Sequence, residues 1–211
     1  MIGLLLVALD LIRRLRIKQT ALTAALSALL LIAAALTYRR SIVWSGAIPM
    51  WEDAVQKSPT KARAHFQLAF AYYSANLCNE AEEQYGRTAQ LEKADYMLLL
   101  DWALADNCLG KSDEAIAKLK QAAALEGTAH VYTQIGMMYA KSGRSDEAFR
   151  ALDTAQSIDP NFEVTYVYRG QLFQKLNNRA AAEEQFRRAL EINPHNQQAL
   201  DLLQGLRAGS R

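Results

Sequence analysis

Four short stretches of this chain resemble one another: NEAEEQY (79–85), SDEAIAKL (112–119), SDEAFRAL (145–152) and AAAEEQF (180–186). Each stretch places an alanine inside an acidic helix start, and these alanines are Ala81, Ala115, Ala148 and Ala182, spaced by 34, 33 and 34 residues. Four residues after each alanine comes a large apolar residue, namely Tyr85, Leu119, Leu152 and Phe186. Self-similarity at a fixed period of this length predicts a stack of repeated units.

A second pattern precedes each stretch in the same phase. A small residue recurs where two helices must approach closely, and these residues are Ala69, Ala103, Gly136 and Gly170. Three residues later the chain has an aromatic residue in three of the units, Tyr72, Tyr139 and Phe173, whereas Asp106 breaks this rule. Gly110 and Gly143 fall in the expected turn between two helices. Each unit is therefore predicted to be a pair of helices.

This order of small and large residues at a period of about 34 resembles the tetratricopeptide repeat. The resemblance gives four units within 62–196, which are 62–95, 96–128, 129–162 and 163–196. It implies an all-α fold, an α-solenoid of helix hairpins in which stacked neighbours bury one continuous core. Residues 197–211 are expected to cap the open end, because Ala199, Leu202, Leu203 and Leu206 share one helix face.

The N-terminal part has a different composition. From Gln19 to Tyr38 the chain reads QTALTAALSALLLIAAALTY, 20 residues without a charge. A helix of this length reaches about 30 Å, the hydrocarbon thickness of a bilayer. Lys18 precedes the run, and Arg39 and Arg40 follow it, as charged ends at two interfaces would. We therefore predict a transmembrane helix over 19–40.

Residues 1–18 form a short apolar and basic segment. The first 12, MIGLLLVALDLI, are interrupted by Asp10 and are too short to span a bilayer. They also lack the basic start and the small-residue cleavage site of a signal peptide. Two interpretations remain open: this segment lies in the membrane interface, or it is the end of a truncated span.

The charge of the chain is nearly balanced, with 24 Lys and Arg against 22 Asp and Glu. This balance argues against binding of nucleic acid. Residues 1–40 carry six bases and one acid (6 − 1 = +5), whereas 41–211 carry 18 bases and 21 acids (18 − 21 = −3). RRLRIK (13–18) places four bases before the span, against Arg39, Arg40 and Lys57 after it. The positive-inside rule predicts that the repeats lie on the periplasmic or exoplasmic side.

The junction at 41–61 continues the repeat register backwards. Ala47, Trp51, Ala54 and Pro59 stand where the second helix of a further unit would have its characteristic residues. GAIPMWEDAVQKSP (46–59) is therefore predicted to be a half-repeat, with the end of the span in place of its first helix. We expect this joint to couple the repeats to the bilayer without a flexible tether.

The same junction resembles a second family over about 26 residues, on Tyr38-Arg39-Arg40, Trp44, Trp51–Val55, Lys57-Ser58-Pro59 and Arg63. This family is the transmembrane-and-tetratricopeptide-repeat proteins, in which a many-spanning, glycosyltransferase-like membrane part precedes exoplasmic repeats. The catalytic membrane part has no counterpart in this sequence, so the resemblance implies no transferase activity for the chain.

The sequence contains no recognisable catalytic or metal-binding motif. His65, His130 and His195 are at least 65 residues apart, and no GxSxG, GxxxxGK or HExxH occurs. The recurring acidic pairs are explained as first-turn residues that the helix dipole favours. We therefore expect no enzyme activity, no cofactor and no metal.

Cys78 and Cys108 both fall near predicted turns between helices of adjacent units. A disulfide is one interpretation if the domain is exported. The other, which we favour from the sequence, is two independent small buried residues, because the cysteines occupy positions 17 and 13 of their units.

The resemblance to tetratricopeptide repeats implies a concave groove lined by positions 2, 5, 9, 12 and 13 of each first helix. The candidate groove residues are Arg63, Phe66, Phe70, Tyr73, Met97, Leu100, Leu104, Asn107, His130, Met137, Lys141 and Gln171. The first two units present an apolar lining, and the Lys, Arg and Asn pattern of a carboxylate clamp is absent. Two interpretations stay open: this lining receives a partner, or Phe66, Phe70, Leu100 and Leu104 pack internally.

These patterns predict a membrane-anchored, non-catalytic tetratricopeptide scaffold that holds a protein or peptide partner in its groove. We expect an integral membrane protein that takes neither nucleic acid nor a small-molecule substrate. The alternative hypothesis is that the chain is the C-terminal regulatory or substrate-presenting portion of a polytopic, glycosyltransferase-like membrane protein.

Overall fold

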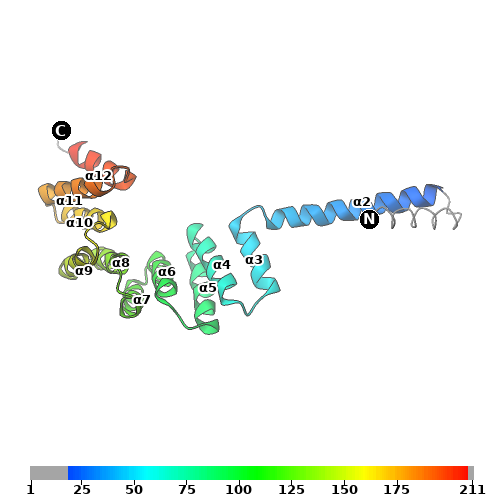
Figure 1. The fold of residues 1–211 in the computed structure, drawn as a ribbon, viewed down its shortest axis with the longest axis horizontal. Coiled ribbons are helices and arrows are strands. Elements are labelled where there is room, and N and C mark those ends of the chain that lie inside the picture. Colours follow the sequence, from blue (N-terminus) through cyan, green and yellow to red (C-terminus); the bar gives the residue numbers. More distant parts are fainter. Residues whose placement is uncertain (1–18, 209–211) are drawn as a thin grey trace. The chain divides into compact units, whose positions relative to one another are not determined.

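The computed structural model describes residues 19–208, and within this range it contains eleven helices, α2 to α12, and no strand (Figure 1). The chain divides into two compact units, up to Asp53 and from Ala54 onwards, and the boundary falls within α3. The all-α prediction is confirmed. Residues 1–18 lie outside the described range, so both interpretations of that segment stay predictions.

The N-terminal unit is dominated by the apolar helix α2 (Gln19–Val43). The stretch from Thr20 to Val43 is long and apolar enough to cross a membrane, and none of it is buried. Helix α2 continues three residues beyond the predicted end at residue 40. At its end the Arg40 guanidinium lies 5.1 Å from the ring centroid of Trp44, and its Nη1 contacts Asp53 Oδ2 at 3.2 Å.

Helix α3 (Ala47–Lys57) forms where the half-repeat was predicted. None of its residues is buried, however, and Ala47 is exposed. The four alanines that mark the second helices of the repeats are, by contrast, fully buried. The helix is therefore present, while its role as a half-repeat that couples the repeats to the bilayer stays a prediction.

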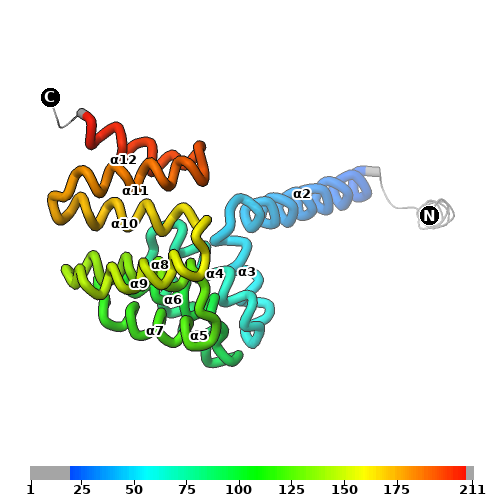
Figure 2. Tube along the Cα trace, turned by 60° about the vertical axis from the view of Figure 1, so that its left-hand side comes forward, coloured from blue at the N-terminus to red at the C-terminus, as the bar shows by residue number. Residues whose placement is uncertain are grey.

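The second unit consists of four helix hairpins and a final helix, which follow one another along the stack (Figure 2). Each first helix has 13 residues and each second helix 14. The pairs are α4 (Ala62–Ser74) with α5 (Cys78–Leu91), α6 (Tyr96–Cys108) with α7 (Ser112–Leu125), α8 (Ala129–Lys141) with α9 (Ser145–Ile158), and α10 (Glu163–Lys175) with α11 (Arg179–Ile192). Helix α12 (Gln197–Ala208) packs on α11, and Leu203 and Leu206 join Phe186 in one buried cluster.

The core depends on a close approach between the two helices of each pair. The large residues of the second helices, Tyr85, Leu119, Leu152 and Phe186, are completely buried. A Cβ added to Gly136 would lie 2.7 Å from Leu152 Cγ, and one added to Gly170 would lie 2.4 Å from Phe186 Cε1. In these two units there is no room for any side chain at the eighth position, which explains why the sequence repeats a small residue there.

Asp106, which breaks the aromatic pattern, is buried at 1% exposure. Lys118 Nζ donates a hydrogen bond of 2.5 Å to Asp106 Oδ2, and the same ammonium lies 4.4 Å from the ring centroid of Trp102. A buried carboxylate needs such a partner, because removing a charge from water is costly. The second unit thus replaces an aromatic contact by an ion pair from α6 to α7.

The structure joins Cys78 and Cys108 in a disulfide, with their Cα atoms 6.1 Å apart. The favoured interpretation of two independent buried residues was therefore wrong, and Cys108 is in fact exposed. Position 17 begins a second helix and position 13 ends a first helix, so both lie at the same end of their hairpins. Stacking of adjacent units brings these ends together, which the register within one unit does not reveal.

The close approach at Gly170 predicts a large effect of a small substitution. Gly170→Ala is expected to destabilise the repeat unit by about 1–3 kcal/mol, since the new methyl overlaps the buried Phe186 ring. Gly205→Ala in α12 is the matched control, because nothing lies within 4 Å of its added Cβ. It should stabilise the helix by roughly 0.5–1 kcal/mol. Urea denaturation of both full-length variants measures the difference, and equal effects would contradict this packing account.

Candidate peptide-binding groove

The first helices α4, α6, α8 and α10 carry the predicted groove residues. Phe70 and Met97 are 50% and 52% exposed, which is unusual for large apolar side chains. Arg63, His130 and Lys141 are also exposed, whereas six others are half-buried, namely Phe66, Tyr73, Leu104, Asn107, Met137 and Gln171. Leu100 is buried and belongs to the core. The two interpretations of the apolar lining therefore apply to different residues.

The fifth position of the first helix is mostly structural. Leu100, Thr133 and Val167 are all buried there, and Thr133 shares a 2.8 Å hydroxyl hydrogen bond with Thr165 of the next unit. The sixth position instead reaches cavities of the groove: Gln67 lines one cavity and Tyr168 another. Sequence reasoning missed these residues, although positions 2, 6, 9 and 13 share one helix face by their i, i+4, i+7 and i+11 spacing.

The first cavity of the groove lies between α4, α5 and α6 and has a volume of about 390 Å³. Its apolar wall includes Phe66, Met97 and Leu98, and Arg63 and Lys93 lie at its polar rim with Glu92 and Asp95. The Phe66 ring packs edge-on against the Tyr85 ring at 5.8 Å between centroids. The structure thus brings together Arg63, Phe66 and Met97, three of the predicted groove residues.

The second cavity lies between α8, α10 and α12 and has a volume of about 380 Å³. It brings together Met137, Lys141 and Gln171 from the predicted set, with Lys175 and Tyr168 beside them. Lys175 Nζ donates a 2.6 Å hydrogen bond to the Ala140 carbonyl. Both cavities combine apolar and polar lining residues, so an apolar first half and a mixed second half of the groove stay a prediction.

A polar cluster lies where α4, α5 and α6 meet. The Tyr85 hydroxyl is fully buried and has no hydrogen-bond partner among the described residues. Burial, with a smaller contribution from the Asp95 carboxylate, raises the pKa of Asp101 to about 6. Burial and then the Asp101 charge raise the pKa of both Tyr73 and Tyr85. Burial and then Tyr73 raise the pKa of Tyr168, so these groups share one electrostatic environment.

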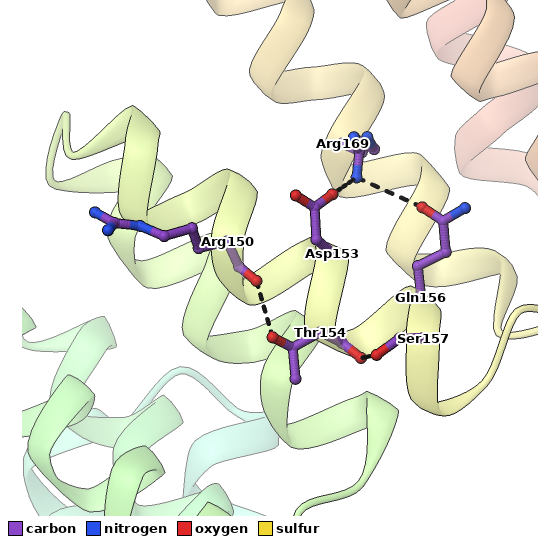
Figure 3. A network of polar contacts seen from close by, with 6 residues as sticks. All are labelled: Arg150, Asp153, Thr154, Gln156, Ser157 and Arg169. Atoms are coloured by element: carbon purple, nitrogen blue, oxygen red, sulfur yellow. Dashed lines mark hydrogen bonds and ion pairs between the residues drawn. The ribbon is translucent and has the colours of Figure 1, made fainter.

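A further cavity of about 690 Å³ lies apart from these two, lined by residues of α9, α10 and α11. Its arginines are matched by acceptors. Arg169 pairs with Asp153 and also contacts Gln156 Oε1 at 3.5 Å (Figure 3). Arg187 and Arg188 pair with Glu183 and Glu191 at 2.6 Å and 2.7 Å. These contacts hold the arginines of this cavity within the structure of the solenoid.

Among residues 19–208, no group of three or more His, Cys, Asp or Glu side chains is placed to hold a metal ion. His65 is buried between Gln84 Oε1 at 2.8 Å and the Pro59 carbonyl at 3.0 Å, so it has a structural role.

Comparison with known proteins defines the class to which this α-solenoid belongs. Models of the tetratricopeptide repeat match residues 129–162 and 164–196. A thermophilic tetratricopeptide repeat protein of Thermus thermophilus has a similar structure, with a TM-score of 0.65 at 22% identity over 89% of this chain and 95% of that chain. No curated protein matches the sequence significantly.

Two further solved structures share the fold. MamA has a TM-score of 0.61 at 24% identity and covers 75% of this chain and 93% of its own. YrrB, described as a tetratricopeptide repeat protein with an unusual peptide-binding site, has a TM-score of 0.57 at 20% identity over 81% and 86% of the two chains. Residues 129–162 and 164–196 are thus tetratricopeptide repeats, and the repeat unit as a whole has the fold of tetratricopeptide repeat proteins. Such repeats support a protein-interaction scaffold.

The environment of Asp101 predicts a pH-dependent stability. Its pKa is about 6 in the folded chain against 3.8 for a free side chain, so the unfolded state releases the proton first as the pH rises. The folded state therefore loses relative stability between pH 4 and pH 6, by about 1–3 kcal/mol after allowance for partial exposure. Asp101→Asn removes this loss.

Urea denaturation at several pH values tests this expectation. As the pH rises from 4 to 6, the free energy of unfolding of Asp101→Asn should increase relative to that of the wild type. Above pH 6 this difference should stay constant. A difference that does not change with pH would contradict the account.

Proposed function

We propose that this chain is a membrane-anchored scaffold whose groove binds a protein or peptide segment of a partner. The observation that carries the proposal is the exposure of Phe70 and Met97 on the groove face of α4 and α6. Large apolar side chains that gather on one concave surface mark an interaction site. The description of YrrB as a protein with a peptide-binding site, on a similar fold, supports the same function.

The groove suits a segment that presents apolar side chains to its first half. Phe66 of α4 and Met97 of α6 line the first cavity, and Phe70 of α4 is exposed one turn further along the helix. Methionine and aromatic side chains adapt to partners of different shape. An amphipathic helix or an extended peptide supplies the matching apolar face.

Anchoring in a membrane is supported by helix α2. It is long enough to cross the hydrocarbon core, and the bases Arg39 and Arg40 and the aromatic Trp44 follow its apolar stretch. The disulfide between Cys78 and Cys108 supports repeats on the periplasmic or exoplasmic side, because disulfides persist in oxidising compartments. The bias of basic residues around the span favours the same orientation. The alternative, a portion of a polytopic glycosyltransferase-like protein, rests on the junction resemblance alone and stays a prediction.

A single substitution in the groove is expected to separate binding from folding. Phe70→Ser should remove most of the partner binding and leave the fold intact, because the Phe70 ring is half-exposed and its loss creates no cavity. A photo-crosslinking residue at Met97, introduced in intact membranes, measures partner occupancy as the yield of crosslinked product.

Leu125→Ser is the matched control, since Leu125 is 54% exposed at the end of α7 and away from both groove cavities. We expect the product to be lost with Phe70→Ser and kept with Leu125→Ser. A crosslink that persists in the Phe70→Ser variant would contradict the proposal that the groove binds the partner.

The proposed side of the membrane is tested with the two cysteines. In cells, a maleimide reagent applied to the denatured chain should label neither cysteine unless a reductant is added first, because the exported domain keeps its disulfide. The Cys78→Ser variant is the control and should expose Cys108 to labelling without reduction. Full labelling of the wild type without reductant would place the repeats in a reducing compartment.

A further inference from the structure

We infer that the solenoid has a second interaction site, separate from the groove, which binds an acidic side chain and its apolar neighbour on a protein partner. This site is a cavity of about 470 Å³ between α7, α8 and α9. Tyr132 and Tyr139 contribute to its wall, and its charged lining residues are two bases, Lys120 and Arg150, and one acid, Glu147. An excess of positive charge beside an apolar wall is complementary to an anionic group with an apolar neighbour.

Helix α8 turns a different face to this cavity than to the groove. Tyr132, Ile135 and Tyr139 follow one another at i, i+3 and i+7 spacing, and all three line the cavity. Met137 and Lys141 of the same helix line the second groove cavity instead. This cavity shares no lining residue with either groove cavity, so a substitution in it leaves the groove lining unchanged.

The one acid of the lining already has a partner within the chain. Glu147 Oε1 accepts hydrogen bonds from Arg144 Nε at 2.9 Å and from Arg144 Nη2 at 2.6 Å. Among residues 19–208, by contrast, Lys120 and Arg150 form no ion pair, and Arg150 forms none with Glu147 three residues before it. Both bases are exposed, so they can bind an anion without first breaking an ion pair.

The corresponding cavity one unit further along the stack is neutralised by the chain itself. This is the cavity of about 690 Å³ lined by α9, α10 and α11, where Arg169 pairs with Asp153. Figure 3 shows this pair, and it shows the Arg150 guanidinium pointing away from it. One unit earlier, the positions of Asp153 and Arg169 are occupied by Lys120 and Ile135. The cavity between α7, α8 and α9 therefore has a base where its neighbour has an internal ion pair.

The shape of the cavity favours a side chain of a larger partner over a free organic acid. Sites for small molecules usually bury most of the ligand's surface, whereas this cavity is open and its two bases are exposed. A protein segment gains further contacts outside the cavity. Its Asp or Glu carboxylate can accept charge-assisted hydrogen bonds from Lys120 and Arg150, while an adjacent apolar side chain packs on the half-buried Tyr132.

A displayed library of random short peptides tests the inference. The full chain, in phosphatidylcholine nanodiscs, is presented as wild type and as the double variant Lys120→Gln/Arg150→Gln. The charge-matched control is Arg187→Gln/Arg188→Gln, which removes two exposed bases of the neighbouring cavity. The wild type and the control should enrich peptides with an acidic residue beside an apolar one, and the double variant should not. Replacing the acid of a selected peptide by its amide should weaken binding to the wild type about 10- to 100-fold and change nothing on the double variant.

Each other outcome overturns the inference. No acidic peptide enriched on the wild type, or equal enrichment on the double variant, removes the role of the two bases. An equal loss on the control would show that net charge, and not this cavity, attracts the peptides. Sodium phenylacetate that binds as tightly as the selected peptide in calorimetry would assign the site to a free organic acid and exclude the protein partner.

Two measurements keep this inference separate from folding and from the proposed groove. Thermal unfolding checks the fold of the double variant, and each single variant, Lys120→Gln or Arg150→Gln, should show part of the same loss of binding. Phe70→Ser should leave the acidic peptides bound, because Phe70 does not line this cavity. Acidic peptides that are lost with Phe70→Ser but kept on the double variant would place their binding in the groove and overturn the second site.

Discussion

The structure depends on the contact between a small residue of each first helix and a large residue of the second helix. Gly136 against Leu152 and Gly170 against Phe186 leave no room for a methyl group. This contact holds the two helices of each pair at a short distance, and the similar helix lengths let each pair repeat the arrangement. Because no single hairpin can cover its own apolar face, the pairs stack, and residues of the first helices line two of the cavities.

Helix α6 shows how one element serves both the core and the groove. Asp106 takes the place of an aromatic residue and is buried with a cation from α7, so the solenoid tolerates a charge in its interior. Asp101, five residues earlier, is half-buried, and burial raises its pKa. Leu100 is buried in the core, whereas Met97 is exposed and lines the first cavity. Residue type alone therefore does not predict whether a side chain of α6 is buried in the core or exposed at the surface.

The two units of the chain are suited to different surroundings. Helix α2 exposes leucines and isoleucines that no other part of the described chain covers, and the basic Arg40 follows them and contacts both Trp44 and Asp53. The repeat unit buries its apolar residues and links its first two hairpins by a disulfide. The overall charge of +2 is thus the sum of +5 for the basic, apolar residues 1–40 and −3 for the mildly acidic residues 41–211.

The repeats and the approximate limits of the helix pairs followed from residue spacing, because small and large residues must recur wherever similar hairpins stack. The spacing did not reveal that Cys78 meets Cys108, nor that the sixth position reaches the groove and the fifth often does not. Both depend on the rotation between adjacent hairpins, which brings helix ends together and turns one face toward the concave side. That rotation results from packing between units, so it cannot be predicted from the residue pattern within one unit.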